Sequence, residues 1–120
     1  MRFFLLLFSA YSISSLVSLA LPKYNFDVKP ILSDRCYHCH GPDKETRKAK
    51  LRLDTEEGIK KALEGGELIA RITSDDPDEV MPPPESKLSV DSDEIETLRQ
   101  WIDAGGNVDS HWSFMPIDKI

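Results

Sequence analysis

The chain has 120 residues, of which 30% are charged, and its formal net charge is −6. This acidic balance argues against nucleic acid and against anionic membrane surfaces as partners. The length beyond the first twenty residues suits one small domain, whose core is marginal unless a covalent group or a metal stabilises it.

The first twenty residues have the pattern of a secretory signal peptide. Arg2 is followed by an apolar stretch that thins out toward residue 19, and Ser18 and Ala20 are the small residues of a cleavage site. A membrane anchor is the alternative, but serines interrupt the apolar run, which is shorter than the ~20 apolar residues a spanning helix needs. We therefore predict a cleaved signal peptide over residues 1–20, export to the periplasm or cell envelope, and no stable membrane span after cleavage.

Residues 24–40 are predicted to form the first helix. Tyr24, Val28 and Ile31 fall at helical spacing. Asp27 is expected to cap this helix, because Pro30 then lies in the first turn, where its missing N–H has no partner to lose. The following Gly-Pro pair at residues 41–42 is expected to end it.

The end of this helix is a C-x-x-C-H sequence at residues 36–40, which contains both cysteines of the chain. This pattern indicates the attachment of one covalent haem c. The thiols of Cys36 and Cys39 would join the porphyrin vinyl groups, and the His40 imidazole would bind the iron from one side. Helical geometry places these three side chains on one face.

Three other interpretations of the pentapeptide are weaker. A thioredoxin-like dithiol requires a βαβ context that the sequence lacks. A zinc site would have to recruit His111 from the tail. A disulfide between Cys36 and Cys39 would close a very small ring and stabilise little.

Basic residues gather at positions 44–52 of an otherwise acidic chain. This segment is either a solvated loop or a patch for docking or for haem propionates. Strand character is confined to the short segment 51–53. A capping pattern at 54–57 opens a helix that ends at the glycines 65–66, and a second short helix follows over 67–73.

The second half of the chain begins with a loop over residues 74–89, rich in proline and acidic residues. Asp91 and Glu94 then cap a final helix, which ends at the glycines 105–106. Its apolar face consists of residues at helical spacing, namely Ile95, Leu98, Trp101 and Ile102.

Two methionines lie beyond the signal peptide, and one of them is a candidate second iron ligand. A methionine thioether at the sixth position raises the reduction potential of a haem. Met81 is followed by three prolines, which restrict the loop backbone and suit a fixed ligand; the alternative is that it fills a gap in the core. Met115 is expected to be a packing residue, and His111 is a less favoured sixth ligand.

Several segments, in the right order, resemble the planctomycete-type cytochrome c domain: residues 28–43, 51–54, 71–77, 81–85 and 98–102. The resemblance covers roughly residues 24–106. It implies an all-α, small class I-like cytochrome c fold, with three to four short helices and long loops around one covalent haem. It also implies that Cys36 and Cys39 form thioethers, that His40 is the proximal ligand and that Met81 is the distal ligand.

In that family the domain usually opens a longer secreted protein. The expected division is therefore a signal peptide (1–20), a cytochrome c domain (21–106) and a tail (107–120) similar to the start of a following domain. If the chain is a fragment of such a protein, this tail is expected to pack on nothing.

The expected function is that of an exported mono-haem c-type cytochrome domain that carries single electrons. Its partners would be redox proteins or fused downstream domains. An enzyme is not expected, because both cysteines are committed and the carboxylates are scattered. The alternatives are a haem-based redox sensor or a peroxidase-like module of a longer multidomain protein.

Overall fold

The computed structural model describes residues 20–117, with the side chain of Trp112 excepted. The predicted signal peptide therefore falls almost entirely outside the described residues. Over the described range the chain is helical and has no strand. None of its helices combines the length and the apolar character needed to cross a membrane.

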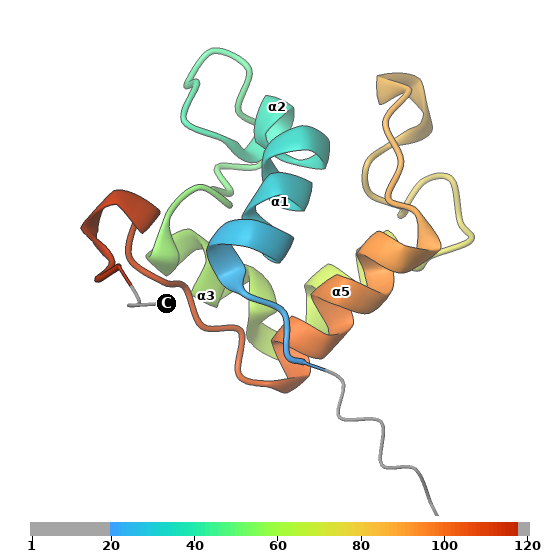
Figure 1. Cartoon of the computed structure of the whole chain (residues 1–120). Helices are drawn as coiled ribbons and strands as arrows, with labels where there is room; N and C mark the ends of the chain where they lie inside the picture. The colour runs from blue at the N-terminus through green and yellow to red at the C-terminus, as the bar shows by residue number, and fades with distance from the viewer. Residues whose placement is uncertain (1–19, 118–120) are drawn as a thin grey trace, which may run out of the picture.

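The helical elements are short and are joined by long loops (Figure 1). In chain order they are η1 (Tyr24–Val28), α1 (Lys29–Arg35), α2 (Tyr37–His40), α3 (Glu56–Leu63), η2 (Glu64–Gly66), α4 (Glu67–Ile72), η3 (Pro84–Ser86), α5 (Ser92–Asp103) and η4 (Trp112–Phe114). The all-α prediction is confirmed, and the globule is consistent with a small cytochrome-like fold.

The predicted first helix is present but is divided into η1, α1 and α2. Asp27 does not cap α1; its carboxylate instead accepts a hydrogen bond from the Lys23 backbone N–H at 2.6 Å. The helical segment begins at Tyr24, as predicted, but its first turn, η1, is a π-helical turn closed by a bond from the Lys29 N–H to the Tyr24 carbonyl. This wider turn carries the chain into α1 although Pro30 has no N–H to donate.

The later helices begin and end close to the predicted positions. Thr55 caps α3 by accepting a hydrogen bond from the Gly58 N–H, and Gly65 and Gly66 adopt positive φ between α3 and α4. Asp91 caps α5. The prediction of strand character at residues 51–53 is wrong. The Leu53 N–H donates to the His40 carbonyl rather than to a partner strand.

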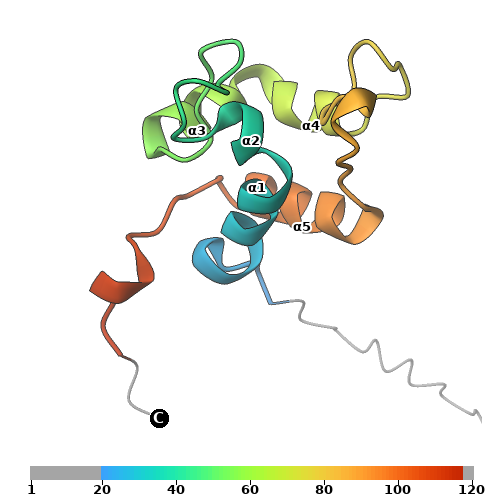
Figure 2. The ribbon, with the colours of Figure 1, turned by 90° about the horizontal axis from the view of Figure 1, so that it is seen from above.

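The core is small and lies where the N-terminal helices meet α5. Its nine buried side chains are Tyr24, Val28, Ile31, Leu32, Leu53, Ile59, Ile72, Leu98 and Trp101. The Tyr24 and Trp101 rings tie η1 to α5, with centroids 5.9 Å apart. Figure 2 shows α5 between η1 and α4, and it contacts both. So small a core is expected to gain stability from a covalently held group.

The tail packs against the N-terminal turn. The Trp101 indole donates to the Asn107 carbonyl at 2.9 Å, and the Asn25 amide donates to the Ser110 carbonyl at 2.7 Å. The Asn25 amide also lies 3.2 Å from the Met115 sulfur. The expectation that the tail packs on nothing is therefore wrong for these residues, since it supplies acceptors that Trp101 and Asn25 require.

Candidate functional site

The C-x-x-C-H sequence forms a single helical turn. Cys36 lies at the junction of α1 and α2, and its carbonyl accepts bonds from the N–H groups of Cys39 (3.2 Å) and His40 (2.9 Å). Side chains three and four residues apart lie on the same face of such a turn. The structure thus brings Cys36, Cys39 and His40 together.

The loop that follows is bonded back to this turn. The Lys48 N–H donates to the Cys39 carbonyl, and the Leu53 N–H donates to the His40 carbonyl, both at 2.7 Å. The Arg47 guanidinium donates to the carbonyls of Gly41 and Pro42, both at 3.0 Å. These bonds satisfy carbonyls that the end of a helix leaves free, so the loop fixes the end of α2.

The back of the turn is closely packed. A Cβ atom on Gly41 would lie 2.3 Å from the Tyr37 carbonyl oxygen, so only glycine fits where the chain leaves α2. Tyr37 packs against the core, which includes Tyr24. Burial raises the pKa of Tyr37, so its partly buried hydroxyl stays protonated.

The two thiols are free and half-buried. Burial raises the pKa of the Cys36 thiol to about 11, and the nearby Glu94 carboxylate acts in the same direction. A thiol that stays protonated at neutral pH is a poor nucleophile. The disulfide that was the weaker alternative for these two cysteines is not formed.

His40 is half-buried, and its Nδ1 atom is fully buried without a hydrogen-bond partner. Burial of Nδ1 leaves Nε2 as the nitrogen that is free to bind iron. Within residues 20–117 no group of three or more His, Cys, Asp or Glu side chains could hold a metal ion. The zinc alternative, which would have recruited His111, therefore has no support in the described part of the chain.

Met81 lies on a different segment of the chain. Its N–H donates to the Arg71 carbonyl at the end of α4, at 3.1 Å. Its side chain is half-buried and is not among those that pack against the core, which disfavours the gap-filling interpretation. No described hydrogen bond or ion pair joins Met81 to α2, and Figures 1 and 2 show the two segments apart. The pairing of Met81 with His40 stays a prediction.

The other two candidates lie in the tail. His111 Nδ1 lies 2.7 Å from the Ser113 hydroxyl, and its ring stands edge-on to that of Phe114. The Met115 sulfur lies against Asn25, but the residue is exposed and is not among those that pack against the core, so the predicted packing role is not supported.

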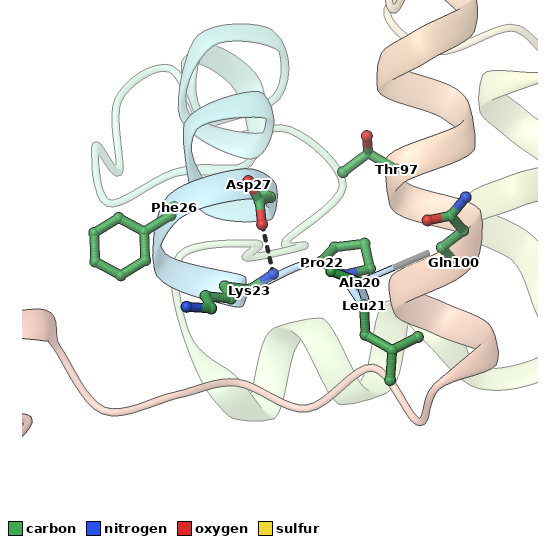
Figure 3. A pocket seen from close by; sticks show the side chains of 8 residues that line it. All are labelled: Ala20, Leu21, Pro22, Lys23, Phe26, Asp27, Thr97 and Gln100. Carbon is green, nitrogen blue, oxygen red and sulfur yellow. Dashed lines mark hydrogen bonds between the residues drawn. The ribbon is translucent and has the colours of Figure 1, made fainter. Parts of the chain in front are cut away.

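A surface hollow of about 870 Å³ lies between residues 20–23, η1 and α5 (Figure 3). Its lining includes Phe26, Thr97 and Gln100 but no thiol, imidazole or thioether. The hollow is therefore separate from the attachment turn.

Two features of the site were missed by sequence reasoning. Arg47 belongs to the basic segment 44–52, yet its guanidinium bonds the end of α2. Glu94 is predicted only as a cap, yet it also pairs with Arg35 at the end of α1. The basic composition of 44–52 was a signal for the first feature, whereas nothing local signalled the second.

The residues present fit a covalent haem. Two free thiols and an imidazole share one helical turn, the imidazole has one buried nitrogen, and a thioether that the core does not use lies elsewhere in the fold. Addition of a thiol across a vinyl group consumes its S–H, so two cysteines that are free rather than joined in a disulfide fit this attachment.

Comparison with known proteins agrees with this chemistry. Residues 36–85 match the model of the family described as planctomycete cytochrome C. The matched segment begins at the first cysteine and includes Met81. It confirms the resemblance inferred from the sequence over that part of the chain. No curated protein and no solved structure gives a significant match.

Proposed function

We propose that this chain, which carries a planctomycete cytochrome C segment, is an exported mono-haem cytochrome domain that carries single electrons. The family match supports haem binding and electron transfer. The observation that carries the proposal is the helical turn with two free thiols and His40, which lies inside the matched segment. When bound, a haem c supplies a reversible one-electron couple.

Each residue of the site has a distinct role in this proposal. Cys36 and Cys39 hold the haem covalently, and His40 binds its iron through Nε2. Met81 is the second iron ligand, and its soft thioether favours the ferrous state. An electron carrier needs no substrate pocket, and the hollow beside η1 and α5 lies away from these residues.

Export is part of the proposal, because the signal peptide pattern at residues 1–20 places the cysteines where haem c is attached. The sequence pattern is its support.

The partner is proposed to be a redox protein, or a fused domain, with an acidic surface. The two arginines of the basic segment 44–52 are already engaged, because Arg47 donates to backbone carbonyls and Arg52 pairs with Asp54. The three lysines of the segment are exposed and form no described ion pair: Lys44, Lys48 and Lys50. These lysines lie on the loop that is bonded to the end of α2. A basic surface on an acidic chain favours encounter with acidic partners, at rates that fall with added salt.

Haem content tests the proposal directly. The full chain, expressed with export and haem attachment, should give a pyridine haemochrome spectrum of haem c that acidified solvent cannot extract. Extractable haem, or no haem, would contradict the proposal. Rapid oxidation by a small soluble redox protein is expected in stopped flow, and rapid turnover of peroxide would contradict the carrier role.

A further inference from the structure

An ion pair joins the end of α1 to the start of α5. The Arg35 guanidinium donates to Glu94 through Nε, at 3.3 Å from both carboxylate oxygens, and through Nη2, at 3.1 Å from Oε1. The exposed fractions of the two side chains are 33% and 20%. Such a pair is less screened by solvent than an ordinary surface pair.

Glu94 has a second role at the same point. Its carboxylate accepts a hydrogen bond from the Asp91 N–H at 3.0 Å, and its own N–H donates to the Asp91 carboxylate at 2.8 Å. Asp91 follows the segment that carries Met81, and Arg35 immediately precedes Cys36. One carboxylate therefore links the two segments that bear the candidate haem-binding residues.

The pair lies at the start of the attachment turn. Arg35 is the last residue of α1 and is followed directly by Cys36, and the Glu94 carboxylate lies 3.1 Å from the Arg35 guanidinium. Two opposite charges are thus held beside a residue that would bind the haem.

We propose that Arg35 and Glu94 shift the reduction potential of the haem held by Cys36 and Cys39 in opposite directions, and that their ion pair balances these two shifts. This inference rests on the proposed function. Reduction adds one electron to the ferric centre and lowers its positive charge by one. A nearby carboxylate therefore stabilises the ferric state and a nearby guanidinium stabilises the ferrous state. In the intact pair the two effects oppose each other.

The pair is best tested by removing its charges one at a time in the haem-loaded full chain. Glu94→Gln keeps an oxygen that can accept from the Asp91 N–H but leaves Arg35 without its counter-charge. At a fixed solution potential its ferrous-to-ferric ratio should rise about three- to tenfold. Arg35→Gln should lower that ratio by a similar factor, and the double variant should lie close to wild type.

Controls separate this electrostatic role from a structural one. Both single variants should have a lower free energy of unfolding than wild type. Their reduction potentials, in contrast, should shift in opposite directions, up in Glu94→Gln and down in Arg35→Gln. Arg35→Lys keeps the charge and should restore the potential even if Arg35→Gln folds poorly. Asp34 contributes to the electrostatic surroundings of Arg35 but is exposed. Asp34→Asn should therefore shift the potential less than Glu94→Gln.

The outcomes are distinct. Shifts of the same sign in both single variants, no shift, or an equal shift in Asp34→Asn would overturn the inference while leaving a covalent haem in place. A wild-type chain without covalent haem would overturn the proposed function and this inference together.

Discussion

The candidate site is divided between two segments that the fold holds in different ways. Residues 36–41 form one helical turn whose end is bonded by two backbone N–H groups and by the Arg47 guanidinium. Residues 74–91 form a loop in which Met81 is held by one described backbone bond, from its N–H to the Arg71 carbonyl. The spacing of the first segment's ligands follows from helix geometry, whereas the placement of Met81 depends on packing between distant parts of the chain.

The largest effect is expected from removing both thiols of the first segment. A Cys36→Ala, Cys39→Ala double variant should lose all covalent haem, because no other cysteine exists in the chain. Pyridine haemochrome analysis after solvent extraction measures this loss. Each single variant should keep one thioether and give a shifted haemochrome band. Haem that stays bound to the double variant after extraction would show that the turn is not the attachment site.

Removing the thioether of the second segment should change the spectrum but not the attachment. Met81→Ala should keep covalent haem, lose the sulfur-to-iron charge-transfer band in the red region and have a lower reduction potential. Met115→Ala is the matched control, since Met115 lies against Asn25 in the tail. If the band survives in Met81→Ala, Met81 is not the second ligand.

A third change tests how tightly the first segment is packed. Gly41→Ala should cost about 1–3 kcal/mol of unfolding free energy, because the new methyl group would meet the Tyr37 carbonyl and the end of α2 would have to open. Denaturant unfolding of the haem-loaded protein measures the change. Lys44→Ala, at an exposed position on the same loop, should lie within about 0.5 kcal/mol of wild type. Equal stability of the two variants would mean that the close contact is relaxed at little cost.

The smallest effect concerns the loop that holds the first segment. The hydrogen-bonded Arg52 guanidinium lowers the pKa of the Asp54 carboxyl. The pair therefore contributes stability above the unfolded-state pKa of about 3.9, and this contribution disappears as pH falls through the folded-state pKa. Asp54→Asn should flatten the acid side of the stability curve, measured by unfolding between about pH 6 and pH 2. Arg52→Gln should have the same effect, and an unchanged curve in both variants would exclude a contribution from the pair.

The features that could be predicted from the sequence are those fixed within a few residues. Thr55 and Asp91 mark the starts of α3 and α5 because their side chains cap the next turn. Gly65 and Gly66 separate α3 from α4 because both adopt positive φ. The C-x-x-C-H spacing likewise determines how its side chains share a face.

The features that were missed depend on residues far apart in the chain. Arg35 and Glu94 are separated by 59 positions, and the contact of Asn25 with Ser110 spans 85. The error at Asp27 has a local cause, because the π turn of η1 admits Pro30 without the expected cap. Capping rules assume regular α-helical geometry, which this turn does not have.

The contact between the tail and η1 has a practical consequence. The tail lies beside η1, and both ribbon views show the two ends of the described chain at a distance from α2 (Figures 1 and 2). A surface linker joined at residue 117 would therefore leave from a part of the fold remote from the attachment turn. Immobilisation through such a linker should leave the α2 face free, so that voltammetry of tethered protein can be compared directly with titration in solution.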